Sequence, residues 1–115
     1  MQSRWKIFQK NLKVVFFEPD KRSSLELSNC GFEVIDKALW SDTTQKELYL
    51  TKKLETSSMF IPNRPFLDMF PDSNRYDVVK TIKVEVTKLD NLINDKNQPH
   101  FIKIDIQGAE LEVLK

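Results

Sequence analysis

FIKIDIQGAELEVLK, residues 101–115, predicts a buried strand followed directly by a helix. Residues 101–106 form a nearly continuous apolar run, as expected of a strand that is covered on both faces of a parallel sheet. Gly108 permits a tight turn after this strand. Residues 109–114 then combine apolar and acidic side chains in a helical pattern, with negative charge in the first turn, where the helix dipole favours it.

The polar residues at the end of this strand are the first candidates for a functional site. Ligands of open α/β sheets bind at the carboxyl ends of the parallel strands, which draws attention to Asp105 and Gln107. Lys103 and Asp105 share one face of the strand, and Gly108 allows the backbone to bring Glu110 near the strand end. The simpler interpretation is that Asp105 caps the helix while Glu110 complements its dipole.

The composition fits one globular domain with a small-molecule partner. The chain has 115 residues, of which 40% are hydrophobic. Its 18 basic and 17 acidic side chains nearly cancel, so we expect no nucleic-acid partner and no attraction to an anionic membrane. No apolar stretch is long enough to span a bilayer, and no signal-peptide core follows Met1, which favours a cytoplasmic location.

Three rare residue types limit the chemistry further. Cys30 is the only cysteine, so no internal disulfide is possible and we interpret it as a structural thiol. His100 is the only histidine, and no metal site is predicted because no second ligand lies at a suitable spacing. Gly31 and Gly108 are the only glycines, which excludes a dinucleotide fingerprint and a P-loop within these residues.

The remaining pattern alternates helices with strands, which indicates the α/β class. The expected elements are the end of a helix within residues 1–13, a buried strand at 14–17, a short helix after Asp20 that stops at 29–31, a strand at 32–40, a turn at 41–43, a half-exposed strand at 47–51, a strand at 82–87, a short turn capped by Asp90, and the final strand and helix. Residues 53–77 are interrupted by prolines but rich in aromatic residues, so we predict a packed flap that either covers the core or also contacts a ligand.

Two further carboxylates follow predicted strands. Glu18 ends the strand of VVFFEPD (residues 14–20), where a carboxylate can accept hydrogen bonds from both hydroxyls of a ribose. A solvated charge at a strand end is the alternative. Asp42 ends ALWSD (residues 38–42), where it can accept from an adenine amino group or simply form the local turn.

Taken together, these stretches resemble a known family. EPD, ALWSD, KLDNL and IKIDIQGAELEVLK are similar in type, order and spacing to the FkbM family of S-adenosylmethionine-dependent methyltransferases, over residues 14–115. The resemblance implies a class I methyltransferase fold, a Rossmann-like doubly wound α/β sheet. It also implies transfer of a methyl group from S-adenosylmethionine to a hydroxyl of a sugar or other small metabolite.

The resemblance assigns a role to each candidate residue. Glu18 would bind the ribose hydroxyls of the methyl donor, and Asp42 would lie near its adenine. Asp105 would face the reacting methyl group as the candidate base for the hydroxyl proton, with Glu110 close by. No metal is implied.

The chain also departs from the family pattern. Members carry a first strand and a glycine-rich turn before the EP strand, and further strands after the KIDIQG helix, and residues 1–115 contain neither. We therefore expect one partial domain, a gene fragment or truncated copy, that binds the methyl donor weakly and associates with itself through exposed sheet edges. The alternative is a non-catalytic α/β interaction module that pairs with another chain. A nicotinamide-dependent dehydrogenase half fits less well, because it has no reason to carry KIDIQGAELEV.

Overall fold

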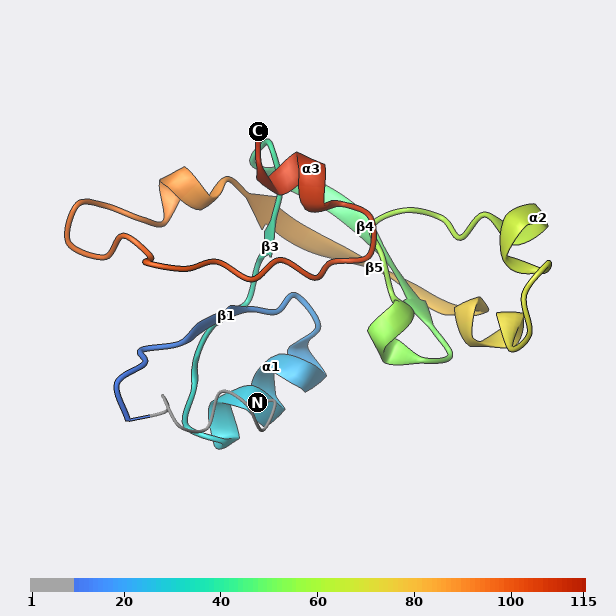
Figure 1. Ribbon diagram of the computed structural model, residues 1–115, viewed down its shortest axis with the longest axis horizontal. Helices are drawn as coiled ribbons and strands as arrows, with labels where there is room; N and C mark the ends of the chain where they lie inside the picture. Colours follow the sequence, from blue (N-terminus) through green and yellow to red (C-terminus); the bar gives the residue numbers. More distant parts are fainter. Residues whose placement is uncertain (1–9) are drawn as a thin grey trace. The chain divides into compact units, whose positions relative to one another are not determined.

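The computed structural model describes residues 10–115, and the chain divides into two compact units at Asp36 and Lys37 (Figure 1). The helix expected within residues 1–13 lies mostly outside the described residues. Where it overlaps them, Lys10 and Asn11 form a turn and no helix. No helix of the described part is long and apolar enough to cross a membrane.

The N-terminal unit is a strand, a helix and a second strand. β1 (Val15–Phe17) and β2 (Glu33–Ile35) pair in parallel, and α1 (Lys21–Asn29) connects them. The rings of Phe16 and Phe32 pack edge to face at 5.1 Å. The predicted strand at 14–17 and the helix after it are confirmed, although the strand is half-exposed and not buried.

The ends of α1 follow from local sequence. Asp20 caps the helix, since its carboxylate accepts a hydrogen bond from the backbone N–H of Arg22 at 3.1 Å. Gly31, with φ of 85°, adopts the left-handed conformation that ends many helices. Both the predicted cap and the predicted stop are confirmed.

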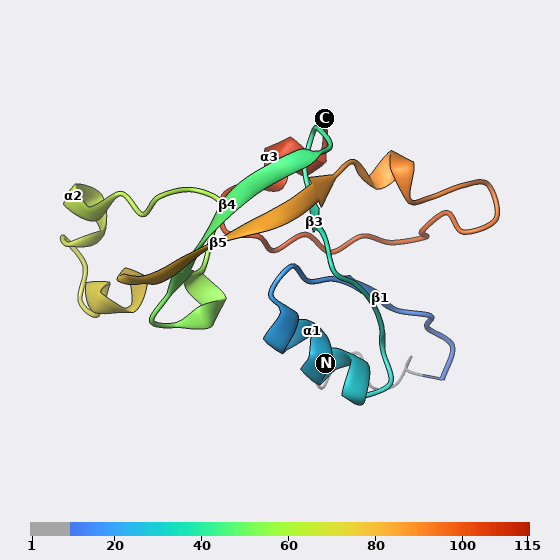
Figure 2. The same ribbon diagram turned by 180° about the vertical axis from the view of Figure 1, so that it is seen from behind.

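The C-terminal unit is built on a three-stranded mixed sheet. β5 (Val78–Thr87) is the central strand; it pairs in parallel with β3 (Ala38–Leu39) and antiparallel with β4 (Thr44–Thr51). Figures 1 and 2 show β4 and β5 as the long twisted pair. The single strand predicted at 32–40 is wrong, because Asp36 and Lys37 interrupt it and leave β2 and β3 in different sheets. The Asp36 carboxylate accepts a hydrogen bond from the Ser24 hydroxyl of α1.

The core of this unit lies on one face of the sheet. Alternate residues of β4 and β5 point toward it, as the sequence pattern predicted. The buried members are Ala38, Leu48, Leu50, Val84 and Val86, and the half-buried side chains packed around them are Trp40, Met59 and Ile82. Only 1% of Val86 is exposed, so it lies at the centre of this core.

Two sequence predictions are wrong in the C-terminal unit. Residues 101–106 form no strand, and Ile102 is 46% exposed where burial was expected. A strand requires a neighbour for its N–H and C=O groups, and none of the described strands pairs with this segment. Asp90 does not cap its turn: the 3₁₀ turn Leu89–Asn91 begins after Lys88 and contains Asp90.

The core position of Val86 can be tested against a residue of the same type on the same strand. Val86→Ala should lower the free energy of unfolding by roughly 2 kcal/mol, because it removes buried methyl groups and leaves a cavity. Val79→Ala, at a position that is 62% exposed, should cost less than about 1 kcal/mol. Urea denaturation of both variants measures the difference, and equal losses would contradict this location of the core.

Candidate functional site

The strongest candidate site is the turn that precedes α3 (Glu110–Val113). The Glu110 carboxylate accepts hydrogen bonds from the backbone N–H groups of Ile106, at 3.2 Å, and of Gly108, at 3.0 Å. Gln107 and Gly108 both have left-handed backbone angles, with φ of 57° and 103°. The Glu110 carboxylate thus closes the turn. The sequence predicted that a turn at Gly108 would bring Glu110 near residues 101–106.

Ser58 of the flap fixes the same turn from the other side. Its hydroxyl donates to the carbonyl oxygen of Gln107 at 2.8 Å and accepts from the N–H of Phe60 at 3.0 Å. Ser58 is buried and forms a bridge with Tyr49 of β4, so the turn is connected to the sheet. Ser58 was not predicted from the sequence, since a serine in a stretch rich in serine and threonine carries no distinctive signal.

Asp105 is the exposed acidic group of this turn. One carboxylate oxygen lies 2.9 Å from the Lys103 ammonium, and the other accepts from the Gln107 side-chain amide at 3.3 Å. The interpretation that Asp105 caps α3 is wrong, because the helix begins after Ala109 and has no side-chain cap. Asp105, Gln107 and Glu110 therefore belong to one preformed turn, with the Asp105 carboxylate accessible to a ligand.

Backbone hydrogen bonds dominate the electrostatics of the Glu110 carboxylate. Hydrogen bonds from its own backbone N–H and from that of Ile106 lower the pKa of Glu110. Partial desolvation and the charge of Asp105 oppose this shift, and the N–H of Gly108 adds to it. Glu110 is thus held ionised by backbone donors and acts as a local brace.

Asp42 lies in an exposed turn of the same unit. Its carboxylate accepts from the N–H of Thr43 at 2.7 Å, as the turn-forming interpretation predicts. The neighbouring Ser41 hydroxyl donates to Glu112 of α3 at 2.6 Å. Hydrogen bonds from Lys115 and from Ser41 lower the pKa of Glu112. The Asp42 turn is therefore tied to the helix that follows the Asp105 turn.

Glu18 belongs to the N-terminal unit, directly after β1. Its backbone N–H donates to Ile35, and one carboxylate oxygen accepts from the N–H of Asp20 at 2.9 Å. Burial raises the pKa of Glu18; the hydrogen bond from Asp20 opposes this shift, and the Asp20 charge adds to it. Among the described residues no second donor reaches this half-buried carboxylate, so it keeps the capacity to accept from a ligand.

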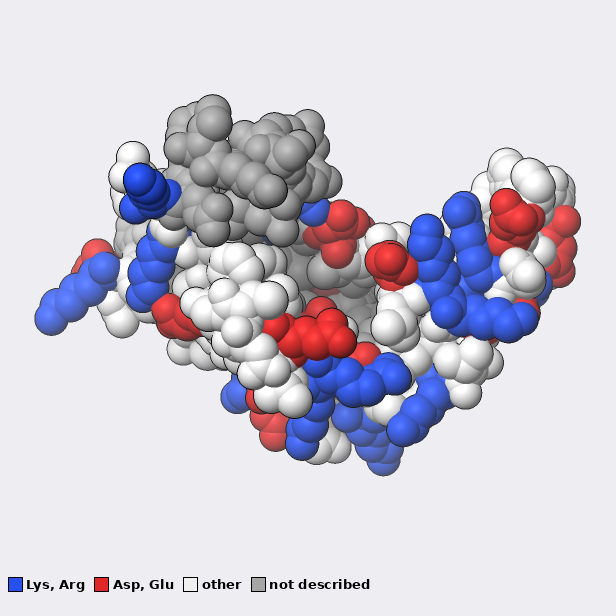
Figure 3. Space-filling model, turned by 90° about the horizontal axis from the view of Figure 1, so that it is seen from below, with Lys and Arg blue, Asp and Glu red and all other residues white. Residues whose placement is uncertain are grey.

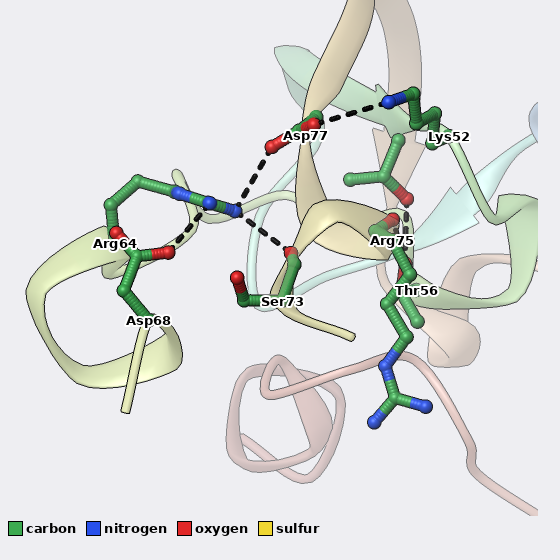
Figure 4. Close-up of polar contacts among 8 residues, drawn as sticks. Lys52, Thr56, Arg64, Asp68, Ser73, Arg75 and Asp77 are labelled. Carbon is green, nitrogen blue, oxygen red and sulfur yellow. Dashed lines mark hydrogen bonds and ion pairs between the residues drawn. The ribbon is translucent and has the colours of Figure 1, made fainter. Parts of the chain in front are cut away.

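The flap, residues 53–77, is fastened by a network around Arg64 (Figure 4). The Arg64 guanidinium lies 2.6 Å from the Asp68 carboxylate and 3.2 Å from that of Asp77, and it donates to the Ser73 carbonyl at 2.9 Å. Asp77 also pairs with Lys52 at the end of β4, at 3.4 Å. One planar side chain thus links three parts of the flap to the sheet.

The aromatic residues of the flap are only partly packed. Phe60 contacts Trp40 at 5.8 Å between ring centroids, beside the Asp105 turn, since Gly108 also approaches the Phe60 ring. Phe66 and Phe70 pack on each other at 5.3 Å, and both remain about half exposed. Met59 is the flap residue that packs against the core, whereas Phe60 is 47% exposed and the tip is held by polar contacts.

Two surface depressions of the described residues are not lined by these carboxylates. One is lined by Gln45, Lys46, Glu47 and Lys83; the other is lined by residues 12–14 and 30–33. Neither includes Glu18, Asp42 or Asp105. Within residues 10–115, no group of three or more histidine, cysteine or acidic side chains is arranged to hold a metal ion.

Comparison with known proteins gives one match. The family model described as "Methyltransferase FkbM domain" matches residues 3–115. No curated protein and no solved structure matches the chain. The match confirms the family resemblance that the sequence motifs indicated, and it extends that resemblance to almost the whole chain.

The Arg64 network should protect the flap against cleavage by a protease. Arg64→Ala should speed cleavage of the flap by chymotrypsin after Phe66 or Phe70, because the tip loses its connection to Asp77. Arg75→Ala is the matched control, since within residues 10–115 the polar and ring contacts of the Arg75 guanidinium are those to the adjacent Tyr76. Equal cleavage rates in the two variants would show that Arg64 does not fasten the flap.

The lowered pKa of Glu110 predicts a pH-dependent contribution to stability. A depressed folded-state pKa contributes stability above the unfolded-state pKa and loses it as pH falls through the folded-state pKa. Glu110→Gln should therefore be less stable than the native chain at neutral pH, and the difference should shrink in acid. Glu55→Gln, on an exposed 3₁₀ turn, is the charge-matched control. Thermal denaturation across the acid range measures both, and a pH-independent difference would rule out the carboxylate's role.

Proposed function

Because the chain belongs to the FkbM methyltransferase family, we propose that it methylates a hydroxyl group of a sugar or other small metabolite, with S-adenosylmethionine as the methyl donor. The preformed turn with its exposed Asp105 carboxylate is the observation that supports this function best. The family implies an α/β methyltransferase fold, and the mixed α/β elements of the described residues agree with it. A Rossmann-like, doubly wound arrangement is part of the proposal.

Glu18 and Asp42 are the proposed contacts of the methyl donor. The Glu18 carboxylate is half-buried and has acceptor capacity left, which suits the two donor hydroxyls of a ribose. Asp42 is exposed and uses one carboxylate oxygen for its own turn, so the other can accept from an adenine amino group. When bound, the donor supplies an electrophilic methyl group on a sulfonium; the chain's own part is to orient it.

Asp105 is the proposed base for the acceptor hydroxyl. Its carboxylate is exposed, and one of its oxygens lies 2.9 Å from the Lys103 ammonium, which orients it. A carboxylate is a weak base toward a neutral hydroxyl, so it takes the proton only as the oxygen loses electron density in the transition state. Glu110 supports this role by holding the backbone N–H groups of Ile106 and Gly108, and with them the turn.

The balance of charge supports a small acceptor of low charge. On the face shown in Figure 3, lysine and arginine side chains lie among aspartate and glutamate side chains. The whole chain has a formal net charge of +1. Nucleic-acid binding depends on many basic contacts to phosphates, and a mixed surface offers no such field.

If Glu18 binds the ribose hydroxyls, Glu18→Gln should bind the methyl donor more weakly than the native chain. The difference in affinity should depend on pH. Ribose hydroxyls donate to the ionised carboxylate, so affinity for S-adenosylmethionine should rise as pH increases through the raised pKa of Glu18. Removal of the charge should weaken binding about tenfold or more and make it independent of pH. Ligand-observed NMR, which detects weak binding, measures the affinity at each pH.

Two further variants make this experiment specific. Glu33→Gln removes a strand carboxylate of the same unit, which pairs with Lys13 on the surface, and should leave the affinity unchanged. Asp105→Asn should retain donor binding but lower transfer of labelled methyl groups to hydroxyl acceptors by about a hundredfold or more. Equal donor binding by the Glu18→Gln and native chains would refute the ribose assignment, and unchanged transfer by Asp105→Asn would refute the proposed base.

A further inference from the structure

Residues 102–106, IKIDI, have the pattern of a strand but form none in the structure. Within residues 10–115 they pair with none of the strands, and residues 102–105 make no hydrogen bond to another backbone group. Ile102, Lys103 and Asp105 are exposed. Residues 102–105 therefore present backbone donors and acceptors to a neighbour, whereas the N–H of Ile106 is already bound by Glu110.

The charges of this segment are complementary to those of an identical segment. Ile104 is its centre, and Lys103 and Asp105 stand one residue to either side. If two copies pair antiparallel about Ile104, each Lys103 lies opposite Asp105 of the second copy, and each Ile102 lies opposite Ile106. A parallel, in-register pair would instead place lysine beside lysine and aspartate beside aspartate, which is unfavourable.

The structure already places the two charges on one face of the segment. The Lys103 ammonium and the Asp105 carboxylate are 2.9 Å apart, as side chains two residues apart can be in an extended chain. In an extended chain, the isoleucines that alternate with these residues lie on the opposite face. The antiparallel pair would thus have one face of alternating charges and one of six isoleucine side chains, three from each copy.

We propose that two copies of this chain associate through residues 102–106, paired antiparallel about a two-fold axis at Ile104. Such an interface is isologous, so every contact occurs twice. Backbone hydrogen bonds supply the attraction, and the two Lys103–Asp105 pairs select the antiparallel orientation. The proposal does not depend on methyl transfer, and its test measures association alone.

Charge exchange within the segment tests the proposal. Sedimentation of the native chain over a range of concentrations should show a monomer in equilibrium with a dimer. Lys103→Asp opposes aspartate to aspartate twice and should raise the dissociation constant about tenfold or more. The double variant Lys103→Asp with Asp105→Lys restores opposite charges across the pair and should return the dissociation constant close to its native value. Lys96→Asp makes the same charge change outside the segment and should have no effect.

A second measurement locates the interface. Amide hydrogen exchange at residues 102–106 should slow as the native chain is concentrated, and this protection should be absent in Lys103→Asp under the same conditions. Circular dichroism establishes that each variant is folded. A native chain that stays monomeric, a dimer that tolerates Lys103→Asp, failure of the double variant to restore pairing, or growth beyond two copies would each overturn the proposal.

Discussion

The antiparallel pairing of β4 with β5 is the interaction on which the C-terminal unit depends. It aligns Leu48 and Leu50 with Val84 and Val86 on one face, and these are four of the five buried residues in the core of this unit. At one end of the pair, Thr51 and Val78 enclose the flap; at the other end, β3 pairs with the last residues of β5. The flap and the Asp42 turn are attached at these ends, and Ser58 connects the Asp105 turn to Tyr49 within β4.

The candidate site is held by side chains that bind backbone groups, and not by a sheet ladder. Glu110 satisfies the N–H groups of Ile106 and Gly108, and Ser58 satisfies the carbonyl of Gln107. Each bond fixes a backbone group that no neighbouring strand satisfies. This explains why the turn keeps a defined shape although residues 101–106 are irregular. It also makes Glu110 a structural partner of Asp105.

Local patterns predicted those parts of the fold whose partners are close in sequence or strongly periodic. The cap at Asp20, the stop at Gly31 and the alternation of β5 depend on short-range geometry, and all three are confirmed. The strand at 101–106 was wrong because an apolar run does not itself provide a neighbouring strand. Ser58 was missed because its hydrogen bond joins residues 49 positions apart. The family was recognised from the order and spacing of several motifs. These can be identified in the sequence even where a predicted strand, such as that at 101–106, is absent from the structure.

Asp105 has two proposed roles, and strand geometry allows both. Pairing between strands uses the backbone N–H and C=O groups at the strand edge, whereas side chains project above and below the sheet. Lys103 and Asp105 share one face, so an antiparallel partner would contribute a second lysine to the surroundings of each Asp105 without covering that face. Association through residues 102–106 would therefore leave the Asp105 carboxylate accessible to the hydroxyl of an acceptor.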